Sequence, residues 1–75
     1  MSHPVDVLTD DYFAMLNDIL PKSGPWGCYA LGMLTVRAVR SGKCPTRELM
    51  IAVSRCSSME ESEAVIDVWL GLKVN

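Results

Sequence analysis

The sequence is short of the groups that stabilise small proteins by cross-linking. Its three cysteines, Cys28, Cys44 and Cys56, are an odd number without close spacing, unlike the framework of a disulfide-rich domain. No Cys-x-x-Cys pair is present and His3 is the only histidine, so we expect no bound metal. Small proteins with small cores are stabilised by disulfides, by a bound metal or by association, and of these only association with another chain remains.

Motifs for catalysis are also missing. No glycine lies five residues before Gly42, where the Gly-Lys pair of a phosphate-binding loop needs one. We expect His3 to lie in an N-terminal arm, away from any cysteine nucleophile. Asp10 and Asp11 suit a helix start better than an acid–base pair. The sequence therefore predicts no catalytic residue, no cofactor and no small-molecule substrate, and a protein that is not an enzyme.

Long apolar runs are absent as well. No run reaches the ~18 residues of a membrane span, and the segment before Asp11 has no apolar stretch of signal-peptide length. The net charge of −2 argues against non-specific binding of nucleic acid. We expect a cytoplasmic protein without a membrane span, folded as one helical domain over residues 1–75. Residues 1–8 are expected to form a partly ordered arm.

What the sequence does contain is a strongly apolar segment. Between Trp26 and Val39 the run WGCYALGMLTVRAV has only Thr35 and Arg37 as clearly polar side chains. A helix that is apolar almost all the way round must be covered on more than one side. A chain of 75 residues buries only roughly 60% of its unfolded surface. We therefore predict that a protein partner or a second copy covers part of this helix.

Four helices and no strand are predicted. Thr9 can cap the first helix and Pro21 ends it. Gly42 and Gly71 suit the ends of the second and fourth helices, and Ser58 can cap the fourth. The expected helices span about Asp10–Leu20, Pro25–Arg40, Pro45–Arg55 and Met59–Leu70. Because the loops are short, sequential helices should be antiparallel neighbours. The predicted fold class is all-α, with four short helices in antiparallel hairpins, as a helical bundle or a tetratricopeptide-like unit.

One stripe of the second helix has the residue types of a protein interface. Trp26, Tyr29 and Met33 share this stripe with Arg37 and Arg40, and these residue types are enriched at protein–protein interfaces and their hot spots. Two alternatives stay open: the aromatic side chains pack under the first helix while the arginines reach solvent, or the stripe holds a small molecule.

A glycine in the same helix points to close packing. An interior glycine costs ~1 kcal/mol relative to alanine, so Gly32 indicates that some group approaches the backbone there.

The fourth helix is apolar over more than one face. Val65, Val68 and Trp69 lie together, and Ile66 and Leu70 widen the apolar arc to roughly 200°. Ile66 and Leu70 therefore either pack on the first helix or form part of an interface. The complete set of predicted partner-binding residues is Trp26, Tyr29, Met33, Arg37, Arg40, Ile66 and Leu70.

Charge is segregated along the chain. Residues 1–20 carry four aspartates and no lysine or arginine. The charged residues of 37–55 are all basic except Glu48, and those of 57–75 are all acidic except Lys73. Neighbouring helices of one chain can complement each other in this way, and so can an antiparallel dimer or an oppositely charged partner. The basic residues of the segment 37–55 are Arg37, Arg40, Lys43, Arg47 and Arg55.

The basic segment leaves two alternative functions open. One is a small, phage-encoded regulator or inhibitor that acts through residues 37–55, and the other is a DNA-binding helical protein. A helix-turn-helix over Thr46–Trp69 is disfavoured, because its recognition helix would begin Met-Glu-Glu-Ser-Glu and phosphate would repel those carboxylates.

Three features resemble the small helical-repeat chaperones of bacterial type III secretion. These are the stretch Phe13-Ala14-Met15-Leu16, the stretch Cys28-Tyr29-Ala30-Leu31-Gly32-Met33-Leu34, and two short helices joined by a serine-rich turn. The resemblance covers about residues 12–70, although Gly32 follows Tyr29 instead of preceding it as in the tetratricopeptide consensus. In such chaperones an apolar groove holds a self-assembling subunit until export.

The resemblance implies a non-enzymatic adaptor or chaperone that covers an apolar helix of its partner. The residues it implies as the lining of the groove are Trp26, Tyr29, Met33, Ile66 and Leu70.

Overall fold

The computed structural model describes residues 7–72, and over this range the chain is all-α. Its elements are α1 (Asp10–Ile19), the 3₁₀ turn η2 (Leu20–Lys22), α2 (Pro25–Ser41), α3 (Arg47–Ser54) and α4 (Met59–Leu70). The predicted fold class is thus confirmed. None of these helices has both the length and the apolar character that a membrane span requires. His3 and most of the predicted arm lie outside the described residues, but Leu8 is buried in the core.

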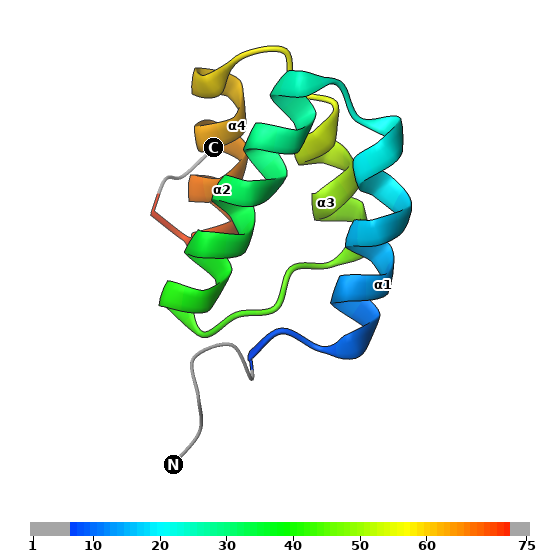
Figure 1. Ribbon diagram of the computed structural model, residues 1–75. Helices are drawn as coiled ribbons and strands as arrows, with labels where there is room; N and C mark the ends of the chain where they lie inside the picture. The colour runs from blue at the N-terminus through cyan, green and yellow to red at the C-terminus, as the bar shows by residue number, and fades with distance from the viewer. Residues whose placement is uncertain (1–6, 73–75) are drawn as a thin grey trace.

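Consecutive helices run in opposite directions, as the short loops predict (Figure 1). α3 lies at the centre of the arrangement and packs against α1, α2 and α4. α4 also packs against α2. The opposite, outward side of α2 faces the viewer in Figure 1, with no helix in front of it.

Side-chain caps fix where three of the helices begin. The Thr9 hydroxyl accepts a hydrogen bond from the Tyr12 N–H at 3.1 Å, and the Ser58 hydroxyl accepts one from the Glu61 N–H at 3.2 Å. A cap of this kind satisfies a backbone donor that the helix itself leaves unpaired. Both caps were expected from the sequence. Thr46 caps α3 in the same way, so this helix begins after Pro45 instead of at it.

Glycine ends α2 and α4. Gly42 has φ +73° and Gly71 has φ +78°, the left-handed conformation that costs glycine little and other residues more. The Gly42 and Lys43 N–H groups both donate to the Ala38 carbonyl, at 3.0 and 3.2 Å. Both predicted helix ends are therefore confirmed.

The core lies between α3 and the inward faces of the other helices. Tyr12 is fully buried, and its hydroxyl is hydrogen-bonded to the hydroxyl of Thr35 on α2. Burial raises the pKa of Tyr12 above its usual value of 10.0, because the phenolate would lose its hydration; the Thr35 hydrogen bond offsets part of this effect. The largest fully buried side chains are Tyr12, Leu31, Leu34, Met50, Val53 and Ile66.

α4 packs against the core with only part of the face that its apolar pattern indicates, since Val65 and Trp69 contact the core but Ile66 is the fully buried residue. Ile66 and Ser62, one turn apart, are buried. Val68 is 38% exposed and Leu72 is 65% exposed. Ser62 can be buried because its hydroxyl donates to the Ser58 carbonyl at 3.0 Å, which satisfies the polar group locally. The prediction that Ile66 lines a partner-binding surface is therefore wrong, because this side chain has no exposed area.

The N-terminal turn of α2 lies against the C-terminal end of α3. A Cβ atom on Gly27 would lie 2.6 Å from the carbonyl oxygen of Ser54 and 2.8 Å from the Cβ of Ser23. Both distances are shorter than atoms can approach without moving. Gly27 is thus the residue of α2 whose small size the packing of this chain requires.

Candidate protein-binding surface on α2

The outward side of α2 carries large apolar side chains in solvent. Trp26 and Tyr29 are each 60% exposed and Val36 is 50% exposed, while Met33 is half-buried. The aromatic side chains therefore do not pack under α1, which was one of the alternatives the sequence left open. A contiguous exposed apolar face on a small protein marks an interaction surface more often than a single exposed residue does.

A shallow depression of about 390 Å³ lies on this outward side. Its lining residues all come from α2, and they are Cys28, Tyr29, Gly32, Met33 and Val36. Tyr29, Gly32, Met33 and Val36 have the spacing i, i+3, i+4, i+7, which is the set of four residues that receives a side chain in helix–helix packing. We call these four residues the α2 hole.

Gly32 deepens the α2 hole. A Cβ atom on Gly32 would have no atom within 4 Å of it, apart from its own helix. The sequence predicted a close approach to the backbone at Gly32, and among residues 7–72 the structure has none there. The close approach occurs at Gly27 instead. Nothing in the packing of the described chain therefore accounts for a glycine in the middle of α2.

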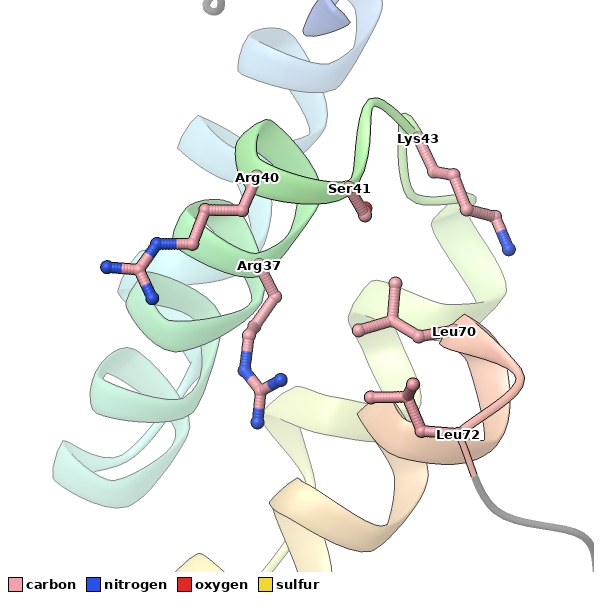
Figure 2. Close-up of a pocket in the computed structure, with 6 residues that line it drawn as sticks. All are labelled: Arg37, Arg40, Ser41, Lys43, Leu70 and Leu72. Atoms are coloured by element: carbon pink, nitrogen blue, oxygen red, sulfur yellow. The ribbon is translucent and has the colours of Figure 1, made fainter.

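A second depression, of about 370 Å³, lies where the C-terminal ends of α2 and α4 meet. We call it the C-terminal hollow; Figure 2 draws its lining residues, which are Arg37, Arg40, Ser41, Lys43, Leu70 and Leu72. Leu70 and Leu72 extend towards α2, while Arg40 and Lys43 extend away to opposite sides (Figure 2). The hollow is therefore lined by the apolar Leu70 and Leu72 on one side and by polar and charged side chains of α2 and the following loop on the other.

Two of the cations of the C-terminal hollow have partners within the chain. Arg37 forms an ion pair of 3.6 Å with Asp67 on α4. The Lys43 ammonium donates a hydrogen bond of 2.9 Å to the carbonyl of Trp69 and lies 5.1 Å from the centre of the Trp69 ring. A cation in this position complements the negative end of α4. Arg40, in contrast, is exposed and has no ion pair within residues 7–72.

Two arginines of the basic segment pair with aspartates on two different helices. Arg37 points to Asp67 of α4, whereas Arg47 at the start of α3 forms an ion pair of 3.6 Å with Asp18 of α1. Complementarity within the chain therefore accounts for two of the five basic residues of the segment 37–55. Surface ion pairs of this kind contribute little to stability.

The predicted partner-binding residues thus fall into three groups. Trp26, Tyr29 and Met33 lie together on the outward side of α2, Arg37, Arg40 and Leu70 line the C-terminal hollow, and Ile66 is in the core. Sequence reasoning missed Val36 and the role of Gly32 as part of a hole. The spacing 29, 32, 33, 36 was the signal that could have identified them.

No set of three potential metal ligands clusters within residues 7–72. Comparison with protein-family models, with curated proteins and with solved structures finds no match for the chain.

Proposed function

We propose that the protein is a non-enzymatic binding protein whose outward α2 face covers an apolar helix of a partner protein. The α2 hole is the observation that carries the proposal. It combines two half-exposed apolar side chains, Tyr29 and Val36, with a glycine that the described chain does not need for its own packing. A partner helix that places one bulky side chain over Gly32 would bury this face and explain the glycine.

Charge defines the partner further. α2 has two arginines and no acidic residue, and Arg40 lies unpaired at one end of the exposed stripe within the described chain. A partner helix with a carboxylate at the end that meets Arg40 is therefore favoured, and charge of this kind sets orientation and association rate.

In biological terms, we propose a cytoplasmic adaptor or chaperone, and we place it in bacterial type III secretion because of the resemblance in the sequence. The surplus of apolar surface supports this proposal: a chaperone that holds a self-assembling subunit must present an apolar face to it. The regulator and DNA-binding alternatives have less support, because Arg37 and Arg47 are engaged by aspartates of the same chain.

The test uses two designed amphipathic helical peptides with the same leucine face, one flanked by glutamates and the other by lysines. We expect the glutamate peptide to bind more tightly, and Tyr29→Ser to weaken its binding roughly tenfold, as loss of an aromatic anchor does. Phe13→Ser is the matched control, since Phe13 is an exposed aromatic residue on α1. Equal losses for the two variants, or binding of neither peptide, would overturn the proposal.

A further inference from the structure

We infer that, when no other partner is bound, the outward face of α2 is covered by α2 of a second copy of this chain in an antiparallel, two-fold symmetric dimer. The inference rests on the proposed function in that it assigns an occupant to the same face. Symmetry of the exposed stripe, the shape of the α2 hole and the placement of charge each support it.

The exposed stripe is nearly symmetric about a point at or just before Met33. Trp26 lies seven residues before Met33 and Arg40 seven residues after it, while Tyr29 lies four before and Val36 three after. When two copies of α2 pack antiparallel about a two-fold axis near Met33, each Trp26 faces Arg40 of the second copy. In the same arrangement each Tyr29 faces Val36 of the second copy, so that exposed apolar side chains meet each other. A two-fold interface needs this self-complementarity.

The α2 hole fits the same arrangement. Its centre lies between Gly32 and Met33, so the residue of a second copy that enters it about the same axis is Met33. Because Gly32 has no side chain and open space beside it, the hole has room for the flexible methionine. The two helices can then approach closely at the point where they cross.

The C-terminal hollow receives the remaining large side chain. Trp26 and Arg40 lie about 21 Å apart along the helix axis, at 1.5 Å per residue. The antiparallel arrangement therefore brings Trp26 of the second copy to the rim of the hollow, where Leu70 and Leu72 supply apolar contact. The unpaired guanidinium of Arg40 can stack on the indole ring there. Both depressions of the surface are then filled by residues of α2.

Charge selects the antiparallel orientation. In a parallel pair, Arg40 would meet Arg40 of the second copy, without an acidic residue on α2 to offset the repulsion. The antiparallel pair separates these cations by about 21 Å, well beyond the ~8 Å over which salt screens charges at physiological ionic strength. It also sets the two helix dipoles in opposite directions.

The first test is subunit mixing, with dimerisation measured by sedimentation equilibrium. Trp26→Ala and Arg40→Ala each remove both Trp26–Arg40 contacts of the dimer, and we expect each to weaken dimerisation roughly tenfold. A mixture of the two variants forms a heterodimer that keeps one of the contacts, so it should be tighter than either variant alone. A monomer at concentrations up to about 1 mM, or a mixture no tighter than its components, would overturn the inference.

The second test locates the two-fold axis. In a chain with Cys28→Ser, Cys44→Ser and Cys56→Ala, a cysteine introduced by Met33→Cys lies close to its counterpart and should form a disulfide between copies on mild oxidation. Phe13→Cys in the same background is the control and should cross-link far more slowly. Circular dichroism of the reduced chains checks folding, and equal cross-linking at both positions counts against the inference.

The two proposals can fail separately. Peptide binding is measured below the dimer dissociation constant, where the α2 face is free. A monomer that binds the glutamate peptide overturns the dimer and supports the proposed function. A dimer that cross-links at position 33, and whose dissociated copies bind neither peptide, supports the dimer and overturns the proposed function.

Discussion

Two glycines of α2, Gly27 and Gly32, lie five residues apart and face opposite environments. A Cβ atom on Gly27 would collide with the backbone of α3 at 2.6 Å, whereas one on Gly32 would meet nothing within 4 Å. The packing of the chain thus requires one glycine and leaves the other unexplained. Among residues 7–72 the inward face of α2 is thus closely packed against the rest of the chain, whereas its outward face is exposed.

Apolar side chains stand on both faces, so the difference between the faces is one of contact and not of composition. Leu31, Leu34 and Ala38 on the inward face have no exposed area. Trp26, Tyr29 and Val36 on the outward face are half or more exposed. The inward face of such a helix stabilises the fold, and its outward face is available to another helix.

The largest difference between the faces should appear on truncation of an apolar side chain. Leu34→Ala should lower the free energy of unfolding by about 2–5 kcal/mol, because it leaves a cavity in the core. Val36→Ala, two residues along, should change it by no more than about 0.5 kcal/mol in the monomer. Urea unfolding at low protein concentration measures both. Similar losses for the two variants would mean that the outward face is already covered within the chain.

The next effect concerns the close contact with α3. Gly27→Ala should destabilise the fold by about 1–3 kcal/mol through overpacking against Ser54, although alanine favours a helix by ~1 kcal/mol. Thermal unfolding followed by circular dichroism gives the change. A Gly27→Ala chain as stable as the parent chain would mean that α2 and α3 lie farther apart than the distance of 2.6 Å between the added Cβ and the Ser54 carbonyl oxygen indicates.

Tyr12→Phe tests the polar link between α1 and the inward face. The change removes the hydrogen bond to Thr35, for which we expect a loss of about 0.5–1.5 kcal/mol. Thr35 keeps its own bond to the Leu31 carbonyl at 2.8 Å, which limits the loss.

The Tyr12 link also predicts a dependence on pH. Because burial raises the pKa of Tyr12 above 10.0, the native state holds its phenol proton more tightly than the unfolded state does. Its contribution to stability is therefore full below about pH 10 and is lost as pH rises through the raised value. Urea midpoints measured across this range should fall in the parent chain and in the Tyr29→Phe control. They should fall less in Tyr12→Phe, and an equal fall in all three would contradict the assignment.

The smallest effect should have the opposite sign. Gly32→Ala should stabilise the monomer by up to ~1 kcal/mol, since alanine is the better helix former and open space surrounds the site. The same change should weaken association through the α2 hole. Thermal unfolding at two protein concentrations separates these effects. A Gly32→Ala chain that is less stable than the parent at low concentration would show that the packing of the chain itself requires Gly32, as it requires Gly27.

Much of the fold was predictable because it depends on local chemistry. The caps at Thr9 and Ser58 and the left-handed glycines at 42 and 71 follow from groups that lie within four residues of the helix ends they define. Among the candidate site residues, helical spacing alone placed Trp26, Tyr29 and Met33 on one stripe, and the structure leaves Trp26 and Tyr29 exposed and Met33 half-buried. Periodicity places these side chains on one face, but it left open whether that face packs under the first helix.

The rotation of α4 was not predictable in the same way. Its apolar arc is wide enough to allow more than one inward face, and hydrophobicity favoured the face with Val65, Val68 and Trp69, of which Val65 and Trp69 contact the core. The buried positions are instead Ile66 and Ser62, and Ser62 can be buried because its hydroxyl donates to the Ser58 carbonyl. The same ambiguity placed Ile66 wrongly at the surface.

Sequence alone thus determined the number of helices, the ends of most of them and the excess of apolar side chains, because caps, turns and periodicity act over a few residues. Tertiary structure decided which side of each helix is inward and which glycine the packing needs. Those outcomes depend on contacts between segments distant in the chain, such as Gly27 with Ser54 and Tyr12 with Thr35, and no local pattern encodes such contacts.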